Sequence, residues 1–204
     1  MGDLELEVHL TVEGCSASRL ATLGGELRCD TKVIEIVLEQ GDEPPRQVML
    51  TWHHRDGVDA ASAEAARISA SLACQNLRCS RVKIEAPVDG LEWGVGRYLE
   101  HHVLVRADAR SDALRWIASR HGAALSRTPR RISGKGQVER FINQRWWDPD
   151  SAVDGMSAFD RMANEVASAG LHIVERIHER VLLDTNQAID GGWLPETIDA
   201  RKPA

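Results

Sequence analysis

The stretch that decides the fold is residues 4–13, LELEVHLTVE, in which apolar and polar side chains alternate without a break. A period of two is typical of a β-strand with one buried face. Leu6 and Val8 fall on one face of this strand, whereas Glu7 and His9 fall on the other. We therefore expect a strand that covers a core with one side and presents ionisable groups on the other.

The sequence around this strand predicts a βαββαβ unit. Its elements are a strand at 4–13, a helix at 18–27, strands at 31–39 and 47–53, a helix at 59–77 and a strand at 80–86. The turn at 41–45 (GDEPP) makes the middle two strands a hairpin. Apolar residues at helical spacing, from Ala61 to Leu72, give the second helix one buried stripe. This order is that of the ferredoxin-like fold.

The same pattern begins again at an offset of 93 residues, where 99–102 (LEHH) matches 6–9 (LEVH). The second half is expected to hold a strand at 98–105, a helix ending near 122, a basic loop at 130–136, a strand at 139–146, a helix ending at 170 and a strand at 171–183. We therefore predict an α+β protein of two tandem ferredoxin-like repeats, 1–92 and 93–204, each an antiparallel sheet with helices on one face. The helix-free faces either meet, closing a pseudo-symmetric barrel or cleft, or face water.

The composition is that of a globular protein. Of the 204 residues, 43% are hydrophobic and 27% are charged, which excludes wholesale disorder. No apolar run is long enough for a membrane span and no signal peptide is visible, so we expect a cytoplasmic protein with four free thiols and no membrane partner. Between Arg106 and Arg145 there are ten basic and three acidic residues, in a chain of net charge -6. A local basic region in an acidic chain favours an anion site and makes a nucleic-acid partner unlikely.

The predicted helix-free face is rich in ionisable side chains. The repeated Glu-x-His places His9 and His102 as a central pair with catalytic roles. With Glu7 and Glu100, the same histidines form a candidate site for a divalent transition metal. Basic residues on the last strand of each half are the candidate clamps for an anionic substrate: Arg81, Lys83, Arg176 and Arg180.

Three short stretches resemble known families. Residues 101–108 (HHVLVRAD) resemble the opening strand of a vicinal oxygen chelate module, in which a strand histidine from each half binds a metal. Residues 9–12 (HLTV) are similar to the motif of two-histidine phosphoesterases, although Leu104 replaces the hydroxyl residue in the second copy. Glu5-x-Glu7-x-His9 is similar to the signature of CYTH phosphatases, with histidine in place of lysine.

Together these patterns predict a protein that binds a small anionic molecule, such as a phosphorylated one, in a polar cleft between its halves. Whether it transforms that molecule, and whether a metal takes part, stays open. One alternative is a non-catalytic interaction or homodimerising module, in which the strand ends that carry Trp147 meet a partner. A further alternative is a phosphoester or triphosphate hydrolase.

Overall fold

The computed structural model describes residues 4–28, 30–39, 45–88, 96–108, 112–132, 137–147 and 152–194. The first half contains β1 (Leu6–Glu13), α1 (Ala17–Leu27), β2 (Lys32–Leu38), β3 (Arg46–His54), α2 (Val58–Ala73) and β4 (Arg78–Pro87). The second half contains β5 (Tyr98–Asp108), α3 (Asp112–Arg120), β6 (Ala124–Ile132), β7 (Gln137–Trp146), α4 (Ala152–Ser168) and β8 (His172–Asp184). A short 3-10 helix, η3 (Gln187–Asp190), follows. The βαββαβ order therefore occurs twice.

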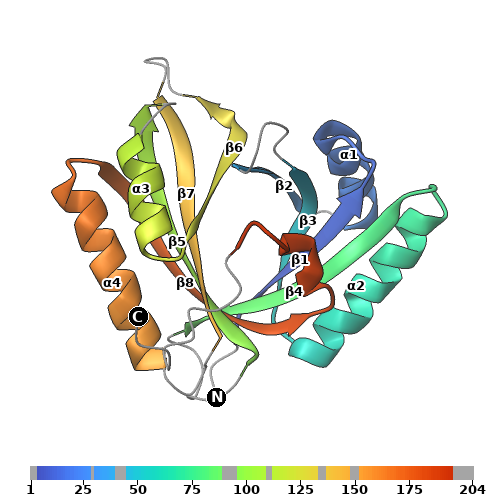
Figure 1. Ribbon diagram of the computed structural model, residues 1–204. Helices are drawn as coiled ribbons and strands as arrows, with labels where there is room; N and C mark the ends of the chain where they lie inside the picture. The colour runs from blue at the N-terminus through green and yellow to red at the C-terminus, as the bar shows by residue number, and fades with distance from the viewer. Residues whose placement is uncertain are drawn as a thin grey trace.

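The strands form one closed antiparallel barrel in the order β1-β3-β2-β6-β7-β5-β8-β4. Within each half the first strand lies between the third and the fourth, as the ferredoxin-like order requires. The halves join where β4 pairs with β8 and where β2 pairs with β6. Figure 1 shows α1 and α2 on one flank of the barrel and α3 and α4 on the opposite flank. The predicted closure into a barrel is therefore confirmed, and the helix-free faces form its interior.

Each half has its own apolar core between its helices and the outer face of its sheet. In the first half, Leu6, Val8 and Leu10 of β1 are buried against the α2 stripe that runs from Ala61 to Leu72. In the second half, β5 is covered by apolar residues of α3 and α4, including Phe159, which has no exposed surface. Each buried leucine contributes about 2 kcal/mol through the hydrophobic effect. These cores hold the polar faces of the strands turned inward.

Helix α1 continues through the Gly24-Gly25 pair because Gly24 faces the core. A Cβ atom on Gly24 would lie 2.7 Å from Leu50 Cδ2, so only glycine lets the helix approach β3 so closely. Nothing lies within 4 Å of the same position on Gly25. The N-terminus of the helix is capped by Ser16, whose Oγ accepts a hydrogen bond from the Arg19 backbone N–H at 3.3 Å.

The segment 185–194 ties the two halves together after β8. The Thr185 Oγ1 accepts a hydrogen bond from the backbone N–H of Val82 on β4, at 2.9 Å. Eight residues nearer the C-terminus, Trp193 Nε1 donates to the carbonyl of Leu125 on β6, at 3.0 Å. Figure 1 shows this segment in red, in front of the strands and between the two flanks. We refer to residues 185–194 as the strap.

Of the region predicted as a basic loop, 130–136, the first three residues belong to a strand. Residues 124–132 form β6, which pairs with both β2 and β7, and residues 133–136 lie outside the described residues. The strand is needed to close the barrel, so tertiary pairing overrides the polar composition and Pro129. Of the predicted free thiols, Cys15, Cys74 and Cys79 are free, and Cys29 lies outside the described residues. None of the described helices combines the length and the apolar character that crossing a bilayer would need.

Candidate functional site: a charged cavity inside the barrel

The barrel interior contains a cavity of about 450 Å³. Its apolar lining residues are Ala17, Val33, Ile34, Ile36, Met49, Phe141 and Ile177. Its polar lining residues are Glu7, His9, Glu35, Lys83, Glu85, His102, Ser126, Thr128, Asn143 and Glu179. The two kinds are interspersed, since Ile177 lies opposite His102 and Phe141 lies opposite Ser126. Both halves of the chain therefore contribute to one cavity.

Lys83 is one of the polar lining residues and joins the two halves. Its Nζ is 2.8 Å from Glu85 Oε1 on the same strand and 2.7 Å from Glu100 Oε2 on β5. Burial works to lower the pKa of Lys83, but the charges of Glu100 and Glu85 outweigh it and raise that pKa above its ordinary value. Burial likewise opposes the ionisation of Glu100, whose pKa Lys83 and Arg145 nevertheless hold well below its usual range. Lys83, Glu85 and Glu100 are therefore all charged.

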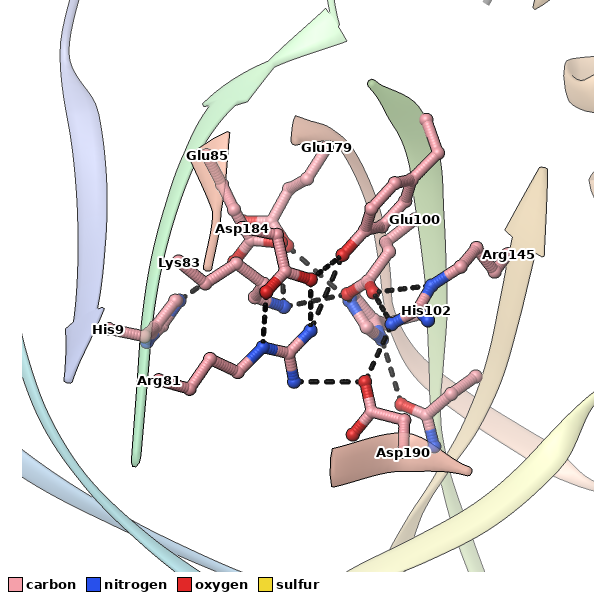
Figure 2. A network of polar contacts seen from close by, with 12 residues as sticks. His9, Arg81, Lys83, Glu85, Glu100, His102, Arg145, Glu179, Asp184 and Asp190 are labelled. Carbon is pink, nitrogen blue, oxygen red and sulfur yellow. Dashed lines mark hydrogen bonds and ion pairs between the residues drawn. The ribbon is translucent and has the colours of Figure 1, made fainter. Parts of the chain in front are cut away.

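A second group of ion pairs lies beside the cavity, where the strap enters the barrel. Arg81 donates from Nε to Asp184 Oδ1 at 2.9 Å and from Nη2 to Asp184 Oδ2 at 2.6 Å, and Tyr98 OH donates to the same carboxylate at 2.5 Å. Asp190 of η3 is 2.9 Å from Arg81 Nη1 and 2.8 Å from Arg145 Nη2. Figure 2 shows Asp190 placed between the two arginines. The carboxylate of Asp190 therefore joins the two halves, because it forms ion pairs with the guanidinium groups of both Arg81 and Arg145.

His102 is held as a cation. Its Nδ1 lies 2.8 Å from Asn143 Oδ1, and the amide nitrogen of Asn143 donates to Ser126 Oγ at 3.1 Å, which fixes the amide oxygen toward the imidazole. Nε2 lies 3.4 Å from Glu179 and 3.6 Å from Glu100. Burial lowers the pKa of His102, but hydrogen bonds to Glu100 and Glu179 outweigh burial and raise it to about 10. A group that is protonated at neutral pH cannot act there as a general base.

His9 also has both ring nitrogens engaged. Its Nε2 is 2.8 Å from Glu85 Oε2, and its Nδ1 is 2.9 Å from Thr51 Oγ1. The order hydroxyl, imidazole and carboxylate resembles a nucleophile with its base and orienting acid. Thr51, however, has no exposed surface, so its hydroxyl cannot reach a substrate. The arrangement orders the cavity wall, and catalytic roles for His9 and His102 stay predictions.

The structure brings most of the predicted site residues together. His9, His102, Glu7 and Lys83 line the cavity, and Figure 2 shows Arg81 and Glu100 in the adjoining ion-pair network: Arg81 contacts Asp184 and Asp190, and Glu100 contacts Lys83, His102 and Arg145.

Arg176 and Arg180 do not join this group. Arg176 is exposed, 3.8 Å from Asp160 of α4, and Arg180 is fully buried opposite Leu99 of β5. In their place β8 presents Ile177 and Glu179 to the cavity. The prediction that Arg176 and Arg180 point into the cleft was wrong. Register shifts between β8 and both of its neighbours change which of its side chains point inward.

The predicted metal set is not assembled. In the part of the chain that the structure describes, no three of the histidine, cysteine, aspartate and glutamate side chains gather to hold a metal ion. Glu100, one of the four predicted ligands, has its oxygens bound by Lys83 and Arg145. His102 is protonated, whereas a metal ligand must be neutral. A transition metal therefore stays a prediction and has no support from this geometry.

Several site residues were missed by reasoning from the sequence. Tyr98 and Arg145 lie within the predicted strands, and the period of two puts Tyr98 on the same face as Glu100 and Arg145 on the same face as Asn143. Glu179 on β8 lies opposite Glu100, as Glu85 on β4 lies opposite Glu7. Asp190 follows the last strand and gives no signal in the sequence, because only the path of the strap brings it to Arg81.

Comparison with known proteins assigns no family. Searches with protein-family profiles and of curated proteins give no match. Among solved structures, the acetolactate synthase small subunit from Thermotoga maritima is 12% identical, with 88% of this chain and 95% of that chain covered and a TM-score of 0.30. A putative glycine cleavage system transcriptional repressor is 12% identical, with 86% and 98% covered and a TM-score of 0.29. A heme-binding protein from Thermus thermophilus is 11% identical, with 87% and 91% covered and a TM-score of 0.28. Similarity this low transfers no function to this chain.

Proposed function

We propose that this protein binds a small molecule in the cavity between its two halves. The observation that carries the proposal is the cavity itself, which measures about 450 Å³ and is lined by both apolar and polar side chains. Small-molecule sites are concave, roughly 300–1,000 Å³ in volume, and lined by apolar side chains with a few fixed polar groups. Lys83, His102 and Asn143 are such groups, since each is held by contacts of its own.

The charge arrangement changes the expectation of an anionic ligand. Both cations that line the cavity already contact carboxylates: Lys83 binds Glu85 and Glu100, and His102 lies near Glu100 and Glu179. An anion would have to displace one of these carboxylates, which would leave a buried charge unpaired. The cavity therefore favours a neutral or positively charged molecule over an anion.

The interaction-module alternative has less support. Trp147, the residue expected to meet a partner, packs within the chain against Tyr98, with ring centroids 5.0 Å apart. The Arg145 guanidinium lies over the same indole at 5.2 Å. A homodimer stays a prediction, and the strand end that carries Trp147 is not a free surface for it.

Methyl NMR on the intact protein tests the binding proposal, with neutral benzyl alcohol as the probe. Ile34, Ile36 and Ile177 line the cavity, whereas Ile68 of α2 and Ile117 of α3 are buried in the two apolar cores outside the barrel. Titration to about 10 mM, which detects a Kd in the millimolar range, should shift the δ1-methyl signals of the first three and leave the last two unchanged.

Two variants test whether benzyl alcohol binds inside the cavity. Ile177→Phe fills part of the cavity and should abolish the shifts, while Val174→Phe, at an exposed position of the same strand, should leave them intact. Unshifted cavity methyls in the unmodified protein, or equal shifts at Ile68 and Ile117, would contradict the proposal.

A further inference from the structure

We infer that the natural ligand carries a protonated amine, which binds the carboxylate of Glu7, and that its apolar body lies against Ile36 and Ile177. This inference rests on the proposed function and names the chemical class of the ligand. It follows from a difference between the two pairs of glutamates that lie on neighbouring strands of the barrel.

Each half presents a pair of glutamates on neighbouring strands. Glu7 of β1 lies directly opposite Glu85 of β4, and Glu100 of β5 lies directly opposite Glu179 of β8. Each pair sits beside a histidine two residues further along the first strand, His9 or His102. Like charges directly opposite each other on a sheet are destabilising unless a cation lies between them.

In the second half a cation is present. Glu100 contacts Lys83 and Arg145, and the His102 imidazolium lies 3.6 Å from Glu100 and 3.4 Å from Glu179, so both carboxylates of that pair lie near a cation. In the first half Glu85 contacts both Lys83 Nζ and His9 Nε2, each at 2.8 Å, and the other nitrogen of His9 faces Thr51 rather than Glu7. Among the described residues, no side chain or backbone group forms a hydrogen bond or ion pair with the carboxylate of Glu7, although its backbone belongs to the sheet. The first half therefore lacks the bridging cation at Glu7.

The surroundings of Glu7 narrow the class of cation. Glu7 is partly buried and lines the cavity together with Ile36 and Ile177, so a cation there would be partly surrounded by apolar side chains. A divalent metal needs several oxygen or nitrogen ligands, and no such group of side chains is gathered in the described residues. An organic ammonium needs one carboxylate for its charge and an apolar wall for its carbon atoms. Both are present on the lining of the same cavity.

Three probes with the same ring and different charges test the inference: benzylamine, benzyl alcohol and benzoate, each titrated at pH 7 against the Ile177 methyl signal. We expect benzylamine to bind at least about tenfold more tightly than benzoate, with benzyl alcohol between them. Glu7→Gln should weaken benzylamine about tenfold and leave benzyl alcohol unchanged. Glu26→Gln removes the same charge from an exposed position on α1 and should change neither.

The possible results separate the two proposals. If benzyl alcohol shifts the cavity methyls and benzoate binds as tightly as benzylamine, the amine assignment is wrong and the binding function stands. If Glu7→Gln leaves the preference for benzylamine intact, Glu7 is not the site of the charge and the inference is overturned. If none of the three probes shifts the cavity methyls, the proposed binding function itself fails.

Discussion

The charge network of the barrel makes the stability of the protein depend on one histidine at alkaline pH. Burial lowers the pKa of His102, but Glu100 and Glu179 raise it to about 10, from 6.5 in the absence of these contacts. The folded protein therefore keeps a proton that the unfolded chain loses. Because the pKa is raised on folding, the stabilisation is fully present below pH 6.5 and disappears as the pH rises through 10.

The size of this effect follows from proton linkage. Where the folded state holds one proton more than the unfolded state, the free energy of unfolding falls by about 1.4 kcal/mol for each pH unit. Between pH 7 and pH 9 this amounts to roughly 3 kcal/mol. The side chain of His102 is 18% exposed, so solvent screening reduces the expected loss to about 2 kcal/mol. That is a measurable share of the roughly 5–15 kcal/mol by which domains are usually stable.

Urea unfolding at pH 7, 8 and 9 measures this loss in the unmodified protein and in His102→Gln. Glutamine can still donate a hydrogen bond to Asn143, but it carries no charge between the two glutamates. At pH 7 the free energy of unfolding of the variant should be lower than that of the unmodified protein. As the pH rises it should fall less steeply, with a slope that is smaller by about 1 kcal/mol per pH unit. Burial raises the pKa of the Cys79 thiol, so that group also titrates differently on folding, but it is the same in both proteins.

The two proteins are compared by how steeply their free energy of unfolding falls with pH. Equal loss of stability between pH 7 and pH 9 in the two proteins would refute the account of His102. A direct check is the pH titration of the His102 ring signals by NMR, which should show no midpoint near 6.5. A midpoint there would mean that Glu100 and Glu179 do not hold the proton.

Three further predictions follow from the same structure. Burial lowers the pKa of His101 to about 3, so stability should fall by about 2 kcal/mol from pH 6.5 to pH 5, and His101→Phe should flatten this acid limb in urea unfolding. Lys83→Met leaves two buried carboxylates without their shared cation and should cost about 3–5 kcal/mol by the same assay, against less than about 1 kcal/mol for Lys32→Met at an exposed position. Gly24→Ala should cost about 1–3 kcal/mol because its Cβ meets Leu50, whereas Gly25→Ala, which meets nothing, should be neutral or stabilising in thermal unfolding.

The general fold could be predicted because its pattern is local. Alternation in β1 and the stripe from Ala61 to Leu72 identify strand and helix within a few residues, and the order of elements then implies a ferredoxin-like unit. The strand β6 could not be recognised in the same way. Its sequence, ALSRTPRRI, is polar and contains a proline, and it forms a strand because β2 and β7 pair with it from the two sides.

The candidate site was predictable where the register is regular. Glu7 and His9 point into the barrel because the apolar residues that alternate with them on β1 pack against the helices on the other face. The facing of β8 depends on register shifts opposite Glu85 and Val105, which no local pattern reveals, and Arg176 and Arg180 were misplaced for that reason. The pairing of Lys83 with carboxylates from both halves is a property of the closed barrel, since neither half contains the whole group.

The most direct test of a ligand cavity between the halves is an intermolecular NOE experiment on the unmodified protein with bound benzylamine. The account predicts NOEs from the aromatic protons of the probe to the methyl groups of Ile36 in the first half and Ile177 in the second, because both line the same cavity. NOEs to exposed residues such as Trp116, with none to these two methyl groups, would contradict it.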